Sequence, residues 1–252
     1  MKKLLLVLLV VALASFLLVG CDTGTTPAEG EGEGEGEGEI SRVVLVELFT
    51  QPNCSYCEIV EPILEELADE YSRDEMILVE ERAYGLYSLD EIRDDRYEWY
   101  FPSIADRSTP NILFNGLNQK IHGSSSYASI KSKINLELGK DAKISISATR
   151  SSDSTTTTIS GTIKNISSST LDNLEINGMN FKDRGQTGLK YSVTDIFAEQ
   201  AVEVSTLAPE DSYNFSFTLE DINWDGNNFH GVVFVQDTDS TKKEVLQSFY
   251  ID

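Results

Sequence analysis

Residues 43–71 read VVLVELFTQPNCSYCEIVEPILEELADEY, and this stretch decides the fold. Residues 43–49 form an apolar run of strand length that only Glu47 interrupts, a pattern typical of a buried strand. Residues 54–71 carry apolar side chains three and four positions apart with acidic residues between them, which predicts an amphipathic helix. A buried strand therefore runs through a short turn into a helix, and the C-x-x-C pair Cys54 and Cys57 stands at the junction.

This position gives the two cysteines different chemistry. Asn53 is a favourable N-cap, so Cys54 is expected in the first helical turn, where free backbone N–H groups and the helix dipole favour a thiolate. Cys57 lies one turn deeper and is placed to resolve a mixed disulfide formed at Cys54. Zinc binding is the rival use of such a pair, but there is no second cysteine pair, and His122 and His230 are far away. We expect no metal and no bound cofactor.

Outward from this motif, strands alternate with helices up to about residue 140. Strands are predicted at 76–79, 111–114 and 119–122, and helices at 88–100 and 125–138. Ser88 and Glu91 have the spacing of a capping box, and Asn115-Gly116 is a hairpin turn. The order is typical of a two-layer α/β domain, which we place at residues 41–140.

After residue 140 the pattern changes to alternating apolar and polar residues. This alternation predicts strands at 142–148, 156–164, 171–178, 189–196, 200–206, 213–219, 230–236 and 243–251. Short strands at this spacing favour an antiparallel β-sandwich, placed at residues 141–252.

The N-terminus has the features of an export signal. Lys2 and Lys3 precede an apolar run, residues 4–20, that is short for a membrane span, and the run closes on Leu-Val-Gly before Cys21. This ending resembles the lipobox of bacterial lipoproteins, which implies a signal peptide at 1–20 and lipidation at Cys21. The alternatives are an ordinary cleaved signal with a chance cysteine and an uncleaved anchor.

Composition then limits the partners. Residues 22–39 read DTGTTPAEGEGEGEGEGE and end in alternating glutamate and glycine, so residues 21–40 are expected to be the lipidated cysteine and a disordered tether. Removing the signal removes two lysines and takes the net charge from −22 to −24, which argues against nucleic acid as a partner. Setting Cys21 aside leaves one cysteine pair, and an exported protein is expected to join Cys54 and Cys57 as a disulfide.

Strand, C-x-x-C and helix together resemble the thioredoxin superfamily. Pro62 matches the proline that kinks the first helix of thioredoxins, and Ser-Thr-Pro-Asn at 108–111 resembles their cis-proline loop. The resemblance implies a cis Pro110 against the cysteine pair and a backbone at Thr109 that receives an extended substrate. The Cys-Ser-Tyr-Cys motif is closer to glutaredoxins than to thioredoxins, and Asn53 replaces the tryptophan that precedes the first cysteine in thioredoxins.

Glu47 is a further candidate site residue. A carboxylate in an apolar strand seven residues before Cys54 is placed to accept a proton from Cys57, and thioredoxins keep a buried aspartate one residue nearer in sequence. The alternative interpretation is that Glu47 is paired with a cation or lies at a solvated strand end.

The second half extends the resemblance. Residues 160–165, 174–176 and 207–209 are similar to bacterial immunoglobulin-like modules, and residues 232–237 and 243–247 resemble outer-membrane-protein-related lipoproteins. That family joins a lipid anchor, a thioredoxin-like domain and a C-terminal β domain. It implies an outer-membrane location, whereas Asp22 after the lipidated cysteine favours inner-membrane retention, so the membrane stays open.

Two functions remain. The first is a membrane-anchored thiol–disulfide oxidoreductase in which Cys54 and Cys57 act on thiols or disulfides of exported proteins. The second is a cell-envelope binding or adhesion lipoprotein in which the thioredoxin-like domain is structural.

Overall fold

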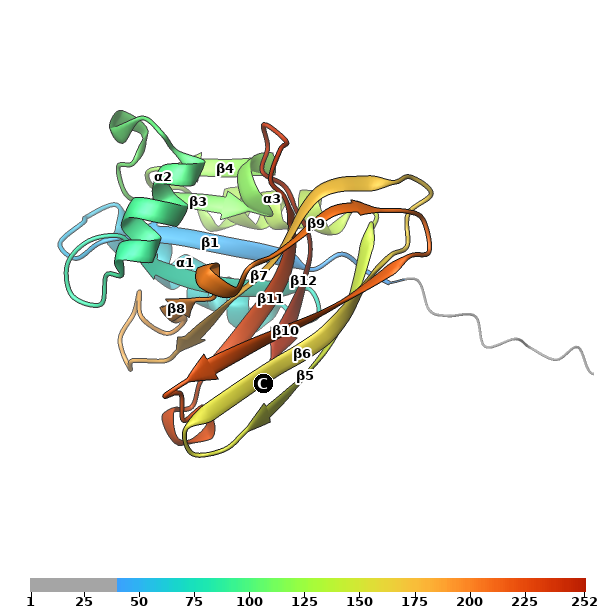
Figure 1. The fold of residues 1–252 in the computed structure, drawn as a ribbon. Helices are drawn as coiled ribbons and strands as arrows, with labels where there is room; N and C mark the ends of the chain where they lie inside the picture. The colour runs from blue at the N-terminus through green and yellow to red at the C-terminus, as the bar shows by residue number, and fades with distance from the viewer. Residues whose placement is uncertain (1–39) are drawn as a thin grey trace, which may run out of the picture. The chain divides into compact units, whose positions relative to one another are not determined.

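The structure, a computed structural model, describes residues 40–252 (Figure 1). The predicted signal peptide, Cys21 and the tether lie outside the described residues. Among the residues that are described, no helix combines the length and the apolar character needed to cross a membrane.

The first half builds one part of a large sheet around a buried central strand. β1 (Val44–Thr50) pairs in parallel with β2 (Met76–Arg82) and antiparallel with β3 (Asn111–Phe114), which pairs with β4 (Gln119–His122). Every residue of β1 is buried, as its apolar run predicts for a strand covered on both faces.

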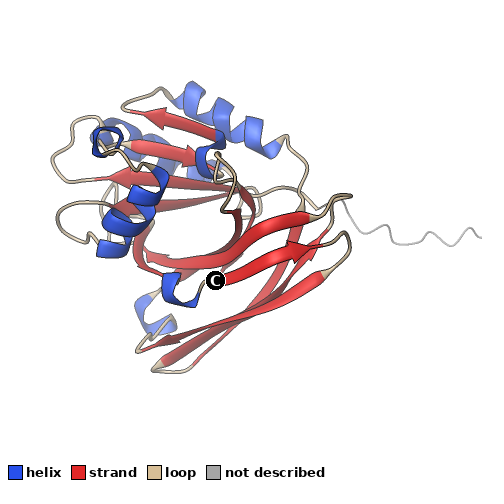
Figure 2. Ribbon diagram, turned by 45° about the horizontal axis from the view of Figure 1, so that its top comes forward, coloured by secondary structure: helices blue, strands red, loops and turns tan. Residues whose placement is uncertain are grey.

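Helices cover both faces of these strands. Along β1, Thr50 donates a hydrogen bond to Glu61 of α1 (Cys57–Glu70), whereas Glu47 contacts Arg96 of η1 (Glu91–Arg96) and Phe49 stacks on Tyr97 of α2 (Tyr97–Tyr100). Because successive strand residues point to opposite faces, α1 lies on one face and η1 with α2 on the other. Figure 2 shows the long helices gathered around this part of the sheet.

Two expected helices begin later than the sequence predicts. The helix expected from Ser88 begins at Glu91, because the Ser88 hydroxyl donates to the Gly85 carbonyl and does not cap. The last helix of this half, α3, spans Tyr127–Leu138, and Ser126 caps it by accepting from the Ser129 N–H. Short 3-10 turns lie at Ile104–Asp106 (η2) and Gly116–Asn118 (η3).

The second half is made of strands, as its alternating pattern predicts. They are β5 (Ile144–Ser152), β6 (Thr156–Asn165), β7 (Leu171–Lys182), β8 (Ser192–Ile196), β9 (Val202–Leu207), β10 (Ser212–Glu220), β11 (His230–Asp237) and β12 (Val245–Ile251). Short 3-10 turns lie at Ala198–Gln200 (η4) and Asp225–Asn227 (η5). In the described part of the chain, β10, β6 and β5 form a three-stranded antiparallel sheet.

The remaining strands of the second half continue the sheet of the first half. The order is β12-β11-β7-β8-β2-β1-β3-β4, with β9 beside β7, and Glu80 of β2 pairs with Ser192 of β8. Without β8, the edge of β2 would carry unpaired backbone groups. The fold is therefore mixed α/β with one large mixed sheet, and one apolar core contains residues of both halves, such as Leu48 and Phe234.

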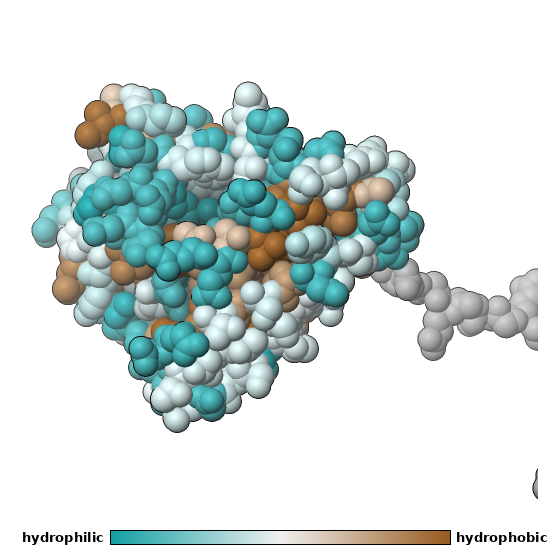
Figure 3. All heavy atoms as spheres, in the orientation of Figure 1, coloured by the Kyte–Doolittle hydropathy of each residue, from teal (hydrophilic) through white to brown (hydrophobic). Residues whose placement is uncertain are grey.

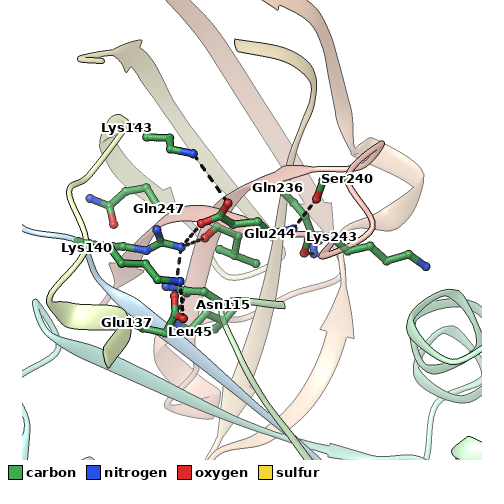
Figure 4. Close-up of polar contacts among 12 residues, drawn as sticks. Leu45, Asn115, Glu137, Lys140, Lys143, Gln236, Ser240, Lys243, Glu244 and Gln247 are labelled. Atoms are coloured by element: carbon green, nitrogen blue, oxygen red, sulfur yellow. Dashed lines mark hydrogen bonds and ion pairs between the residues drawn. The ribbon is translucent and has the colours of Figure 1, made fainter. Parts of the chain in front are cut away.

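A buried arginine also joins the two halves, and Figure 4 labels its acidic partners Glu137 and Glu244. Arg42, 2 % exposed, donates to the Val245 carbonyl at 2.9 Å and to Glu244 at 2.8 Å, and it lies 3.4 Å from Glu137 of α3. Since a buried cation needs partners, these contacts fix the chain entering β1 against α3 and β12.

Candidate functional site: the cysteine pair and its loop

Cys54 and Cys57 lie at the junction of β1 and α1 and form a disulfide. Cys54 is 8 % exposed and Cys57 is 1 % exposed. A thiolate arriving from solvent therefore reaches the sulfur of Cys54 first, and Cys57 is shielded by the protein.

The start of α1 differs from the expected cap at Asn53. Asn53 has φ 59°, a left-handed turn conformation, and the helix begins at Cys57. The Cys57 backbone N–H donates to Sγ of Cys54 at 3.2 Å, and the Glu58 N–H donates to the Cys54 carbonyl at 3.1 Å. The N-cap residue of α1 is Tyr56, which makes no side-chain cap, and the N–H that reaches Sγ of Cys54 stabilises a thiolate there.

The loop before β3 lies against the same sulfur. The Thr109–Pro110 peptide bond is cis. The Thr109 carbonyl oxygen and its hydroxyl oxygen each lie 3.6 Å from Sγ of Cys54. The structure thus brings Cys54, Cys57, Thr109 and Pro110 together.

A polar network that the sequence did not indicate holds this loop. Asn111 donates to the Tyr97 hydroxyl at 2.7 Å and to the Ser108 carbonyl at 3.2 Å. His122 bonds Asn111 through Nδ1 at 2.8 Å and the Ser108 hydroxyl through Nε2 at 3.0 Å. The register pair Asn111–His122 of β3 and β4 brings these groups together, and only the sheet register reveals it.

Glu47 lies away from this group. It accepts from Arg96 at 2.5 Å and from the Tyr100 hydroxyl at 2.8 Å, on the sheet face opposite to α1. These contacts match the alternative interpretation from the sequence, in which Glu47 is paired with a cation. The proton-acceptor role stays a prediction with no contact to Cys57 to support it in the described part of the chain.

A different carboxyl, missed by the sequence reasoning, shares a helix face with Cys57. Glu61 follows Cys57 by four residues on α1, and both side chains are buried, so they lie one turn apart on one face. Thr50, the last residue of β1, donates to Glu61 at 2.5 Å. Burial raises the pKa of Glu61, with Glu65 and Glu58 adding to the rise and the Thr50 hydrogen bond and Arg82 opposing it.

Exposed apolar side chains occur in the motif and in a neighbouring loop. Tyr56 is 58 % exposed and Leu86 is 70 % exposed. The loop of Leu86 packs on the turn before the cysteines: Gly85 has φ +84°, and a Cβ there would lie 2.5 Å from Pro52. Apolar groups of this kind are available to contact a bound polypeptide.

The described residues contain no candidate metal site, because no three histidine, cysteine or acidic side chains among them are grouped to hold an ion.

Comparison with known proteins identifies a shared fold. No protein-family model and no curated protein sequence matches this chain. The solved structure of HBP35 of Porphyromonas gingivalis matches with TM-score 0.67 and 14 % identity over 85 % of this chain and 76 % of that one. A domain of the outer membrane lipoprotein Omp28 from the same organism matches with TM-score 0.32 and 16 % identity over 44 % of this chain and 88 % of its own. The HBP35 match shows that the described fold is an existing one.

Proposed function

We propose that this chain is a membrane-anchored thiol–disulfide oxidoreductase that acts on exported or envelope proteins. In this proposal residues 41–140 are a thioredoxin-like domain and residues 141–252 an immunoglobulin-like β domain. Cys21 carries the lipid that holds the protein at a membrane outside the cytoplasm. The substrates are thiols or disulfides of other proteins, and no cofactor is required.

The observation that carries this proposal is the asymmetry of the disulfide. Sγ of Cys54 is the more exposed sulfur, accepts the Cys57 N–H at 3.2 Å and lies 3.6 Å from Thr109. A purely structural disulfide has no need of an accessible sulfur whose thiolate is stabilised on release.

The steps follow from this geometry. A substrate thiolate attacks Sγ of Cys54, the Cys54–Cys57 bond breaks, and Cys57 leaves as a thiolate that takes up a proton. A second substrate thiolate then attacks the substrate sulfur of the mixed disulfide, and Cys54 leaves. The substrate dithiol is oxidised to a disulfide and the cysteine pair is reduced, and the reverse reaction follows the same steps backwards. The backbone of Thr109 positions the substrate segment beside Cys54.

Glu61 is the proton donor and acceptor for Cys57 in this proposal. Burial raises the pKa of this carboxyl, which lies one turn from the leaving sulfur. The charged groups that influence it come from its own helix and from β2, namely Glu58, Glu65 and Arg82.

The test of the function is turnover of a disulfide-bonded peptide by dithiothreitol. The wild-type chain is expected to accelerate this reaction, and a Cys54→Ser/Cys57→Ser variant is expected to leave the rate at that of buffer. Equal rates for the two proteins would refute an oxidoreductase and leave the binding lipoprotein.

The proton-transfer role has its own prediction. Glu61→Gln is expected to slow exchange by about a hundredfold or more, since a positioned acid or base contributes about 10²–10⁴-fold. The variant should also flatten the pH dependence of the rate. Glu66→Gln, which changes an exposed glutamate of the same helix, is the matched control and should retain the wild-type profile. Identical profiles for wild type and Glu61→Gln would remove Glu61 from the mechanism.

A further inference from the structure

A groove of about 940 Å³ lies on the face of the sheet opposite to α1. Helices η1 and α2 form one wall, and strands β7 and β9 contribute to the other. Figure 3 views this face, where hydrophilic residues cover the region of η1 and α2 beside a hollow. The cysteine pair belongs to the α1 side, so this groove is separate from the site described above.

The groove is lined by acidic side chains on both walls. Those on η1 and α2 are Glu91, Asp94, Asp95 and Glu98, and those on β7 and β9 are Glu175 and Glu203. The one cationic side chain of the lining, Arg96, is already paired with Glu47. Asp94 and Glu98 pair with Arg93 and Arg107, while the other four carboxylates have no ion pair in the described part of the chain. The field in the groove is therefore strongly negative.

Two further features point to a ligand. Glu175 and Glu203 stand directly opposite each other in the β7–β9 register, where like charges destabilise a strand pair, and no cation of the described residues neutralises them. Gln236 lines the groove and is 1 % exposed. Its amide nitrogen donates to Tyr100 and to the Lys243 carbonyl, but its Oε1 accepts no hydrogen bond in the described part of the chain. A ligand with positive charge would neutralise the two facing carboxylates, and its N–H groups would donate to Oε1 of Gln236.

The shape of the site indicates a polypeptide. The carboxylates are spread over four elements, which matches charges spaced along a chain better than one compact ion. β9 pairs only with β7 in the described residues, so its other edge is available to an extended segment. We propose that this groove binds an extended polypeptide segment rich in arginine or lysine.

The test is calorimetric titration of the full chain with an acetylated tetra-arginine amide. The peptide is expected to bind, and Glu175→Gln/Glu203→Gln is expected to weaken binding by about fivefold to tenfold, as loss of two charge pairs implies. Glu58→Gln/Glu66→Gln, two exposed glutamates on α1, removes the same charge from the other face and should retain the wild-type affinity.

Three results would overturn the proposal. The first is no binding to the wild-type chain. The second is equal weakening in the two double variants, which would indicate attraction by net charge alone. The third is binding of CaCl₂ that Glu175→Gln/Glu203→Gln abolishes while peptide binding persists, which would make the groove an inorganic cation site. Because glutamine retains the shape of glutamate and removes the facing charges, the groove variant is expected to fold, and its unfolding midpoint checks this.

Discussion

At the scale of single residues, burial raises the pKa of two carboxyl groups on the α1 side of the sheet, Glu80 and Glu61. Glu80 of β2 accepts the Tyr191 N–H at 2.8 Å on one oxygen, and its other oxygen has no partner in the described part of the chain. Burial, with Glu65 and Glu61 adding to it, raises the pKa of Glu80 to about 8, against the opposing effects of Tyr191 and Arg82.

This shift has a definite consequence for stability. Because the folded pKa lies above the unfolded one, the folded state binds the extra proton between about pH 4.3 and pH 8. The contribution of Glu80 to the free energy of unfolding is therefore complete below that range. It is lost as pH rises through the range, by about 1.4 kcal/mol per pH unit. Glu80→Gln, which is neutral at every pH, should be more stable than wild type at pH 8 and should lose this slope.

Urea unfolding at pH 5 and pH 8 measures the effect. Glu66→Gln, which changes an exposed residue of α1, should keep the wild-type slope. A Glu80→Gln variant whose unfolding free energy falls with pH as steeply as wild type would contradict the assignment.

The residue scale also shows where sequence reasoning reaches its limit. The cysteine pair and Thr109-Pro110 are recognisable from the sequence because local order fixes them. Local sequence does not show whether Glu47 or Glu61 lies on the side of the sheet that carries Cys57. For Glu47 on β1, the face to which the side chain points depends on where the helices pack. Thr50 faces α1, so Glu47, three residues earlier, faces η1.

At the scale of elements, η1 and α2 are attached to the sheet by a buried charge pair. Arg96 of η1 bonds Glu47 of β1 and the Tyr100 hydroxyl, and its guanidinium lies 4.8 Å from the centre of the Phe234 ring on β11. Glu81 of β2 is fully buried nearby, and burial together with the charge of Glu47 raises its pKa well above the usual range.

Arg96→Met is therefore expected to destabilise the protein by about 3–5 kcal/mol at neutral pH, because Glu47 is left buried without its cation. Urea unfolding gives the value. Arg93→Met is the matched control: Arg93 pairs with exposed Asp90 and Asp94 of the same segment, and its loss should change little. Equal unfolding free energies for the two variants would show that the buried pair does not hold η1.

The sequence predicts the position of most strands, but it does not predict which strands lie side by side. Alternation locates β5 to β12 because it reports a half-buried strand, but it carries no information about which strand lies beside it. The pairing of β8 with β2 joins residues 112 positions apart, Glu80 and Ser192, and depends on the tertiary fold.

At the scale of the whole molecule, the shared sheet predicts a single cooperative unit over the described residues. The division at residue 140 stays a prediction. The chain contains two tryptophans, Trp99 on α2 and Trp224, which is 1 % exposed, before η5. They report separately on the two halves.

Fluorescence of Trp224→Phe and Trp99→Phe variants during urea unfolding tests this unit. Each variant retains one reporter, and circular dichroism of the same sample gives its global transition. We expect each fluorescence transition to coincide with the global one, as two-state unfolding requires. A Trp99 transition separated from the circular dichroism transition would instead indicate two domains that unfold independently.

Thiol–disulfide exchange at Cys54 is tested most directly by trapping its mixed disulfide. Reduced Cys57→Ser chain is mixed with disulfide-bonded envelope proteins, and adducts are separated without reductant. Exchange at Cys54 predicts covalent adducts through this residue that dithiothreitol releases and that Cys54→Ser/Cys57→Ser does not form. Absence of adducts, together with a Cys54 thiol that reacts no faster than a free peptide cysteine, would contradict it.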